Sequence, residues 1–121
     1  MPRKRNIEIR IRLVKDMLEK ESVYGECYDL DSSPNGRYYT IRLDYAAEDV
    51  YTIISTLAHE MVHIKQFARG ELRMLNAGYC AKWKGEKYLD GIEYDSCPWE
   101  IEANTLEPVL TARVLSKYGL L

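Results

Sequence analysis

Two histidines and the glutamate beside one of them are the residues most able to do chemistry in this chain. His59 and His63 are its only histidines, and with Glu60 they form the motif H-E-x-x-H. Residues four apart lie one turn above each other on a helix, so both imidazoles can bind one metal ion, usually zinc. The glutamate between them can take a proton from water that the metal activates. The motif therefore predicts a zinc site with Glu60 as general base.

A catalytic zinc site needs a third protein ligand and leaves a fourth position to water. We expect Glu100 to be that ligand, because Pro98 suits the first turn of a helix and places Glu100 in that turn. Asn104 follows on the same face, where it can accept a hydrogen bond from the second ring nitrogen of a ligand histidine. Glu102 should point to a different side of this helix. Cys97, as a thiolate, is the alternative third ligand.

These residues resemble the gluzincin metallopeptidases, whose third ligand comes from a helix of the pattern E-x-x-A-[D/N]. Here the pattern reads Glu100-x-x-Ala103-Asn104. The chain is closest in size to the minigluzincins, and ImmA/IrrE-like, CAAX-prenyl-protease-like and SprT-like zincins share the pattern in part. Asn104 stands where many gluzincins carry Asp, which would leave the histidine it orients less basic. The resemblance implies zinc-dependent hydrolysis of peptide bonds in a peptide or protein substrate.

Two other functions are compatible with the same residues. The ImmA/IrrE resemblance allows a regulatory or accessory protein whose zinc site is structural or acts on a single partner protein. A hydrolase of non-peptide amides is the third interpretation. In each hydrolase a hydrogen-bond donor must stabilise the oxyanion, and no histidine remains for that role. A tyrosine such as Tyr88 or Tyr94, or an arginine, would have to supply it.

Length and composition predict a single domain over residues 1–121, with 46% hydrophobic residues to form one core. The net charge of −2 argues against general nucleic-acid binding, and we expect the basic segment Pro2–Arg5 to be a solvated terminus. No apolar run is long enough to cross a membrane, and no signal peptide is visible. Three cysteines without a motif favour reduced thiols and a cytoplasmic location: Cys27, Cys80 and Cys97.

The expected fold is a small α+β domain of minimal zincin type, with a sheet and hairpin packed on the H-E-x-x-H helix and a glutamate helix after it. Apolar residues alternate with charged ones over 7–13, which predicts a half-buried strand, followed by a helix over 14–21. A helix through 6–21 is the competing interpretation. Strands over 23–30 and 37–43 should flank an Asn-Gly turn, with Tyr24–Asp29 as the edge strand beside the cleft.

For the motif helix, an apolar stripe predicts the face that packs on the core, with both histidines on the opposite face. Its members are Val50, Ile54, Leu57, Met61, Ile64 and Ala68. The polar side chains on the histidine face suggest a wet cleft: Thr52, Ser55, Thr56 and Gln66. We expect Asp44 to cap the start of this helix and Gly70 to end it. Further on, residues 79–89 should form a second hairpin, and Pro108 should kink or restart the last helix.

Overall fold

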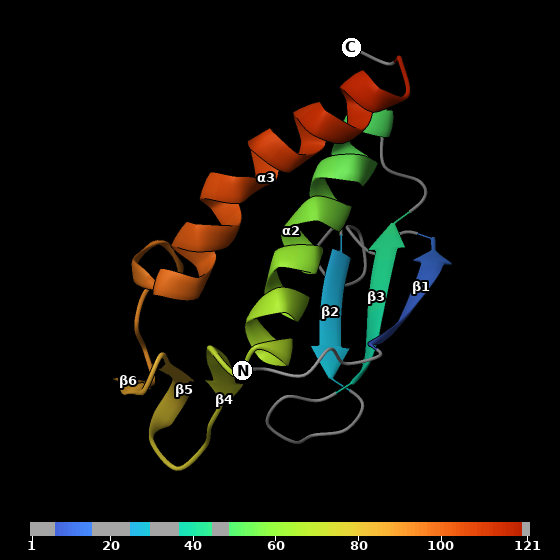
Figure 1. Cartoon of the computed structure of the whole chain (residues 1–121). Helices are drawn as coiled ribbons and strands as arrows, with labels where there is room; N and C mark the ends of the chain where they lie inside the picture. Colours follow the sequence, from blue (N-terminus) through green and yellow to red (C-terminus); the bar gives the residue numbers. More distant parts are fainter. Residues whose placement is uncertain (1–6, 16–24, 30–36, 45–48, 120–121) are drawn as a thin grey trace, which may run out of the picture.

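The computed structural model describes residues 7–15, 25–29, 37–44 and 49–119, which form a small α+β arrangement of two sheets and two helices (Figure 1). This confirms the predicted α+β class. In chain order the elements are β1 (Glu8–Val14), β2 (Gly25–Asp29), β3 (Tyr38–Asp44), α2 (Val50–Ala68), β4 (Leu72–Met74), β5 (Tyr79–Trp83), β6 (Glu86–Leu89), the 3-10 turn η1 (Tyr94–Ser96) and α3 (Pro98–Lys117).

The first sheet has the strand order β1-β3-β2. β1 runs parallel to β3, and β2 runs antiparallel to it. The strand predicted over 7–13 is therefore confirmed against the competing helix, and so is the pairing of the two strands that follow. Among the described strands β2 lies at an edge, as expected for the segment Tyr24–Asp29. Tyr24 itself, the helix expected over 14–21 beyond residue 15, the turn over 31–36 and the basic segment Pro2–Arg5 lie outside the described residues.

Helix α2 begins five residues later than the sequence suggested. Asp49 is its N-cap, with Oδ1 accepting a hydrogen bond of 2.7 Å from the backbone N–H of Thr52. The expectation that Asp44 caps the helix is wrong, because Asp44 ends β3 and is buried there. The other end is as predicted: Gly70 follows the last turn with a φ of 72°, the left-handed conformation that glycine adopts without strain.

The apolar stripe of α2 is only partly buried. Ile64 packs with Tyr39, Ile41 and Leu43 of β3 in one core cluster. Two other members of the stripe stay in contact with solvent, Val50 at 54% and Met61 at 37% exposure, so that part of the prediction is wrong. The reason is that α2 is covered on two sides, by the sheet and by α3, and its buried residues are divided between them.

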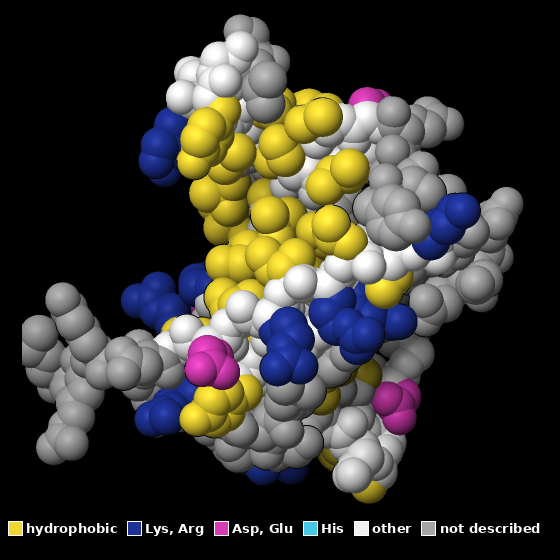
Figure 2. Space-filling view, turned by 90° about the vertical axis from the view of Figure 1, so that its right-hand side faces the viewer, with side chains coloured by type: hydrophobic (Ala, Val, Ile, Leu, Met, Phe, Trp, Pro, Cys, Tyr) yellow, Lys and Arg dark blue, Asp and Glu magenta, His cyan; other side chains and the backbone are white. Residues whose placement is uncertain are grey.

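β1 is more exposed than the predicted half-buried strand. Ile9 packs against the core cluster of the sheet, but Ile11 and Leu13 are 50% and 62% exposed. β1 lies at the outer edge of the described sheet, to the side of α2 (Figure 1). Figure 2 looks onto this side of the molecule and shows apolar side chains gathered mainly in its upper half, with most of the lysine and arginine side chains below them.

The second sheet, β4-β5-β6, packs against the start of α3. Its core cluster joins Leu72, Ala81 and Trp83 to Cys97 and Trp99. β5 and β6 form the predicted hairpin, in which Lys84 and Gly85 make the turn with φ of 47° and 91°. Two positive φ values are typical of a type I′ turn, which matches the twist of the strands. The three-residue strand β4 was not predicted.

Helix α3 is one continuous helix that contains Pro108, so the predicted restart is wrong. Pro108 is exposed, which lets solvent reach the backbone that the proline leaves without a hydrogen bond. Four residues at turn spacing face inward along α3: Ala103, Glu107, Thr111 and Leu115. Neither of the helices in the described residues is long and apolar enough to cross a bilayer.

Candidate metal centre

The candidate site lies between α2 and α3, which run in opposite directions (Figure 1). His63 is near the end of α2 and meets Glu100 in the first turn of α3. His59 lies one turn earlier on α2 and therefore meets the following turns of α3 as well. The antiparallel arrangement explains why a histidine pair on one helix can contact several carboxylates spaced along the other.

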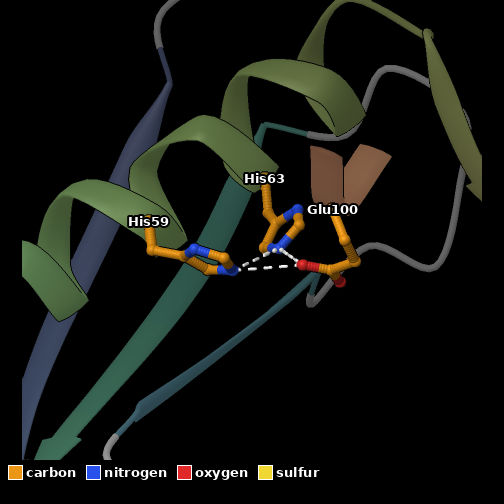
Figure 3. Close-up of side chains that lie close together, drawn as sticks. All are labelled: His59, His63 and Glu100. Carbon is orange, nitrogen blue, oxygen red and sulfur yellow. Dashed lines mark hydrogen bonds and ion pairs between the residues drawn. The ribbon is translucent and has the colours of Figure 1, made fainter. Parts of the chain in front are cut away.

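Three ligand atoms converge at this point (Figure 3). The Nε2 atoms of His59 and His63 are 3.2 Å apart, and Oε1 of Glu100 lies 3.1 Å from the first and 3.0 Å from the second. The side chains are 15%, 10% and 15% exposed, respectively, so the group sits just below the surface. The three residues predicted as metal ligands are thus brought together.

The size and chemistry of this triangle fit a zinc ion. Tetrahedral zinc with bonds of 2.0–2.2 Å to nitrogen and oxygen separates its ligand atoms by about 3.3 Å. The observed edges of 3.0–3.2 Å are only slightly shorter. Two imidazole nitrogens and one carboxylate oxygen form a donor set typical of catalytic zinc, which keeps a fourth position open. The geometry suits other divalent ions that accept the same ligands.

Each histidine presents Nε2 to the group because Nδ1 is engaged elsewhere. Nδ1 of His59 lies 3.1 Å from Oε1 of Glu107, and Nδ1 of His63 lies 2.8 Å from Oε1 of Gln66. An ionised carboxylate only accepts hydrogen bonds, so Glu107 requires a proton on Nδ1 of His59. In the neutral ring the lone pair is then on Nε2, toward the metal position.

The site is also electrostatically matched to a cation. Burial would raise the pKa of Glu100, but hydrogen bonds with the two histidines lower it to about 2. The hydrogen bond with Glu100 raises the pKa of His59. Burial lowers the pKa of His63, yet its hydrogen bonds with Glu100 and Gln66 outweigh burial and leave the pKa raised. The carboxylate is therefore ionised, and the imidazoles attract positive charge, which a metal ion can supply in place of protons.

Glu60 is buried at 7% exposure, next to His59 in α2. Its negative charge raises the pKa of both histidines, so it lies within electrostatic range of the group without being one of the three converging ligands. A buried carboxylate within that range is a candidate acceptor for a proton from water at the site.

The structure separates the two tyrosines considered as oxyanion donors. Tyr94, in η1, lies close enough to Glu100 that burial, together with the interaction with this carboxylate, raises the pKa of its hydroxyl to about 12. Tyr88 instead packs edge-on against Trp99 and directs its hydroxyl to Glu86. Tyr94 therefore stays protonated at neutral pH and adjoins the site, whereas Tyr88 belongs to the second sheet.

Asn104 does not orient either histidine, so that expectation is wrong. In the described part of the chain Glu107 and Gln66 hold the two Nδ1 atoms, and Asn104 is exposed. The physical reason is the crossing of the helices. His59, on α2, lies opposite a later turn of α3 than His63 does. Glu107, seven residues after Glu100, therefore reaches the His59 ring, and Asn104, four residues after Glu100, does not.

Cys97 is not part of the converging group. It is buried in the cluster with Trp83 and Trp99, where its Sγ donates to the carbonyl of Glu93 at 3.4 Å. Burial raises the pKa of its thiol, which opposes the thiolate form that binds metals. Among the described cysteines, Cys80 and Cys97 are both free.

Two residues at the site were not predicted as part of it. Gln66 was placed on the histidine face as the lining of a wet cleft, but it is fully buried and bonded to His63. Glu107, which contacts Nδ1 of His59, was not among the predicted site residues. Helical spacing carried a signal for both, because Gln66 is three residues after His63 and Glu107 is seven after Glu100.

Comparisons of the chain with models of protein families, with curated proteins and with solved structures found no match.

Proposed function

We propose that this chain is a zinc-dependent metallopeptidase of gluzincin type with a minimal zincin-like fold. The observation that supports this most is the convergence of three ligand atoms within 3.2 Å of one another, from an H-E-x-x-H helix and a following glutamate helix. His59, His63 and Glu100 would hold the zinc ion. The ion would supply Lewis acidity, which acidifies water and polarises a carbonyl oxygen.

Glu60 is the proposed general base. It takes a proton from the attacking water as the water oxygen bonds to the carbonyl carbon. It then returns that proton to the amide nitrogen as the C–N bond breaks, so that an amine and a carboxylic acid form, and the acid releases its own proton to solvent. Its burial at 7% exposure keeps bulk water from competing for the proton.

Tyr94 is the proposed donor to the oxyanion. Its hydroxyl adjoins Glu100 and keeps its proton because its pKa is raised to about 12. A neutral hydroxyl beside the carbonyl can donate a hydrogen bond that strengthens as negative charge develops on the oxygen. The same proximity helps to lower the pKa of Glu100, which places the Tyr94 hydroxyl beside the proposed ligand.

An extended peptide is the substrate form that the first sheet suits. β2 is an edge strand of the described sheet and packs beside α2, the helix that carries both histidines (Figure 1). An edge strand offers unpaired backbone groups to which a peptide can add as a further strand. Such binding holds the scissile bond through its backbone and does not require one particular side chain.

The decisive experiment compares the zinc-loaded protein with its Glu60→Gln variant on a peptide library derived from a proteome. New peptide termini are read by mass spectrometry, and bound zinc is quantified in both proteins. We expect cuts only from the unmodified protein, with equal zinc in the two, because glutamine keeps the size of Glu60 but cannot take a proton.

The other outcomes are equally informative. Zinc bound by both proteins without any cuts would contradict a general peptidase and favour the regulatory or accessory function with a single partner. Cleavage of small amides without cleavage of peptides would favour a hydrolase of non-peptide amides. Cuts that persist in the Glu60→Gln variant would remove Glu60 from the proposed mechanism.

A further inference from the structure

We infer that Glu102, which does not touch the three converging ligands, controls metal affinity by fixing the orientation of Gln66 and through it the tautomer of His63. The inference rests on the metal site of the proposed function, but not on its peptidase chemistry. Glu102, Gln66 and Lys65 form a hydrogen-bonded chain, here called the strut, that contacts His63 at Nδ1, the ring nitrogen facing away from the other two ligands. Of these, Gln66 contacts the ligand, and Glu102 and Lys65 act through it.

The side-chain amide of Gln66 has one orientation that satisfies its surroundings. Its Nε2 lies 2.9 Å from the carbonyl oxygen of Trp99 and 3.0 Å from Oε1 of Glu102. Both of these oxygens only accept hydrogen bonds, so the NH₂ end of the amide must face them. Its Oε1 must then face Nδ1 of His63, 2.8 Å away, and can only accept.

The consequence for His63 is a defined tautomer. Because Gln66 presents an acceptor, Nδ1 of His63 carries a proton, and in the neutral ring Nε2 keeps its lone pair for the metal. A reversed amide would present a donor to Nδ1 and favour a proton on Nε2, which competes with the metal. Gln66 is fully buried, so water does not compensate for a reversed amide.

Lys65 holds Glu102 in the position that this argument needs. Its Nζ lies 2.7 Å from Oε1 of Glu102 and 2.9 Å from Oε1 of Glu71. Lys65 and Gln66 are neighbours on α2, and Glu102 is on α3, so the strut crosses between the helices beside the ligand group. The same carboxylate oxygen of Glu102 accepts from both Lys65 and Gln66.

The test measures zinc affinity by competition with a chelator, at one pH, for the full-length protein and three variants. Gln66→Leu and Glu102→Leu each remove one member of the strut, and both should weaken zinc binding by roughly 10–100-fold. Glu102→Gln loses the charge but keeps an oxygen that can accept from Gln66, so it should retain most of the affinity. Asn104→Ala is the matched control on the same helix and should leave affinity unchanged.

A readout of ligand geometry separates positioning from general stability. Cobalt replaces zinc in such sites, and its visible absorption spectrum reports the donor set and its symmetry. We expect Glu102→Leu to change the cobalt spectrum while the melting temperature of the metal-free protein stays close to that of Glu102→Gln. A purely structural role would lower the melting temperature in both variants and leave the cobalt spectrum of the folded protein unchanged.

Two results would overturn the inference. One is zinc affinity in Glu102→Leu equal to that of the unmodified protein. The other is an equal loss in Glu102→Leu and Glu102→Gln, which would mean that charge and not hydrogen-bond orientation matters. If the unmodified protein binds no zinc, this inference and the proposed function fail together. If it binds zinc but cleaves no peptide, the proposed function alone fails.

Discussion

Nδ1 of His59 and Oε1 of Glu107 are 3.1 Å apart, although 48 residues separate them in the chain. This contact ties the first histidine of the motif to the middle of α3. It also shows that α3 contributes two carboxylates to the site, Glu100 on the ligand side and Glu107 behind the ring. A carboxylate in that position raises the basicity of the imidazole and fixes its orientation.

Replacing Glu107 should therefore weaken metal binding. We expect Glu107→Leu to lower zinc affinity roughly 10–100-fold, because Nδ1 of His59 loses its acceptor. Titration with a competing chelator measures the effect. The Asn104→Ala variant is the control, and a larger loss there than in Glu107→Leu would restore Asn104 as the orienting residue.

The third ligand is tested by a pair of variants. Glu100→Ala should strongly reduce zinc occupancy after dialysis, because it removes one of three ligand atoms. Cys97→Ala should leave occupancy intact, because Cys97 lies in the cluster with Trp83 and Trp99. Elemental analysis of the two purified proteins decides the matter, and the reverse pattern would make Cys97 the ligand.

Tyr94→Phe should slow catalysis without affecting the metal. Loss of one donor to an oxyanion costs on the order of 10²–10³ in kcat. Zinc affinity and KM should change little, since the hydroxyl is proposed to act in the transition state. Tyr88→Phe is the matched control and should retain full activity. Equal activities of the Tyr94→Phe and Tyr88→Phe variants would exclude Tyr94 as the donor.

The metal-free protein should be most stable at mildly acidic pH. His59 and His63 have pKa values raised above 6.5, so their contribution is fully present below pH 6.5 and is lost as pH rises through the raised values. Glu100 has its pKa lowered to about 2, so its contribution is present above its ordinary value of 4.5 and is lost as pH falls toward 2. Melting temperatures measured across this range should peak between those limits.

Zinc should reverse the fall in melting temperature that we expect for the metal-free protein as pH rises above 6.5. The ion binds the histidines only after they release their protons, so its stabilisation should grow as pH rises through their raised pKa values. The measurement is the difference in melting temperature with and without zinc at each pH. A difference that is constant from pH 5 to 8 would show that protons and zinc do not compete for these rings.

Asp49→Ala should destabilise the fold without changing the site. Asp49 caps α2 through a 2.7 Å hydrogen bond to the backbone of Thr52, and loss of such a cap costs about 1 kcal/mol. Urea unfolding measures the loss. Asp49→Asn keeps the acceptor and should lie close to the unmodified protein. A similar loss in both variants would point to charge instead of capping.

Local spacing was enough to predict the core of the site. His59 and His63 share one face of α2 by helical geometry alone, and a helix starting at Pro98 brings Glu100 into its first turn. The class of the fold followed from alternation in β1 and from the turn signals around β5 and β6. These features depend on residues close together in the chain.

The parts that depend on how elements cross were not predictable in the same way. Whether Asn104 or Glu107 faces His59 is decided by the crossing angle and offset of α2 and α3. The residue pattern of neither helix predicts these two quantities. The burial of Gln66 has the same origin. Asp44 was predicted as the cap of α2, but β3 continues through Asp44, so Asp49 caps the helix instead.

The outer strand β1 has a consequence for the behaviour of the protein in concentrated solution. Its Ile11 and Leu13 are exposed at the edge of the described sheet, and an exposed apolar edge strand is prone to pair with another sheet and aggregate. Arg10 and Arg12 alternate with them and bring like charges together whenever two such margins meet. We therefore expect these arginines to act as gatekeepers against self-association, so that neutralising them should make the chain more prone to aggregate.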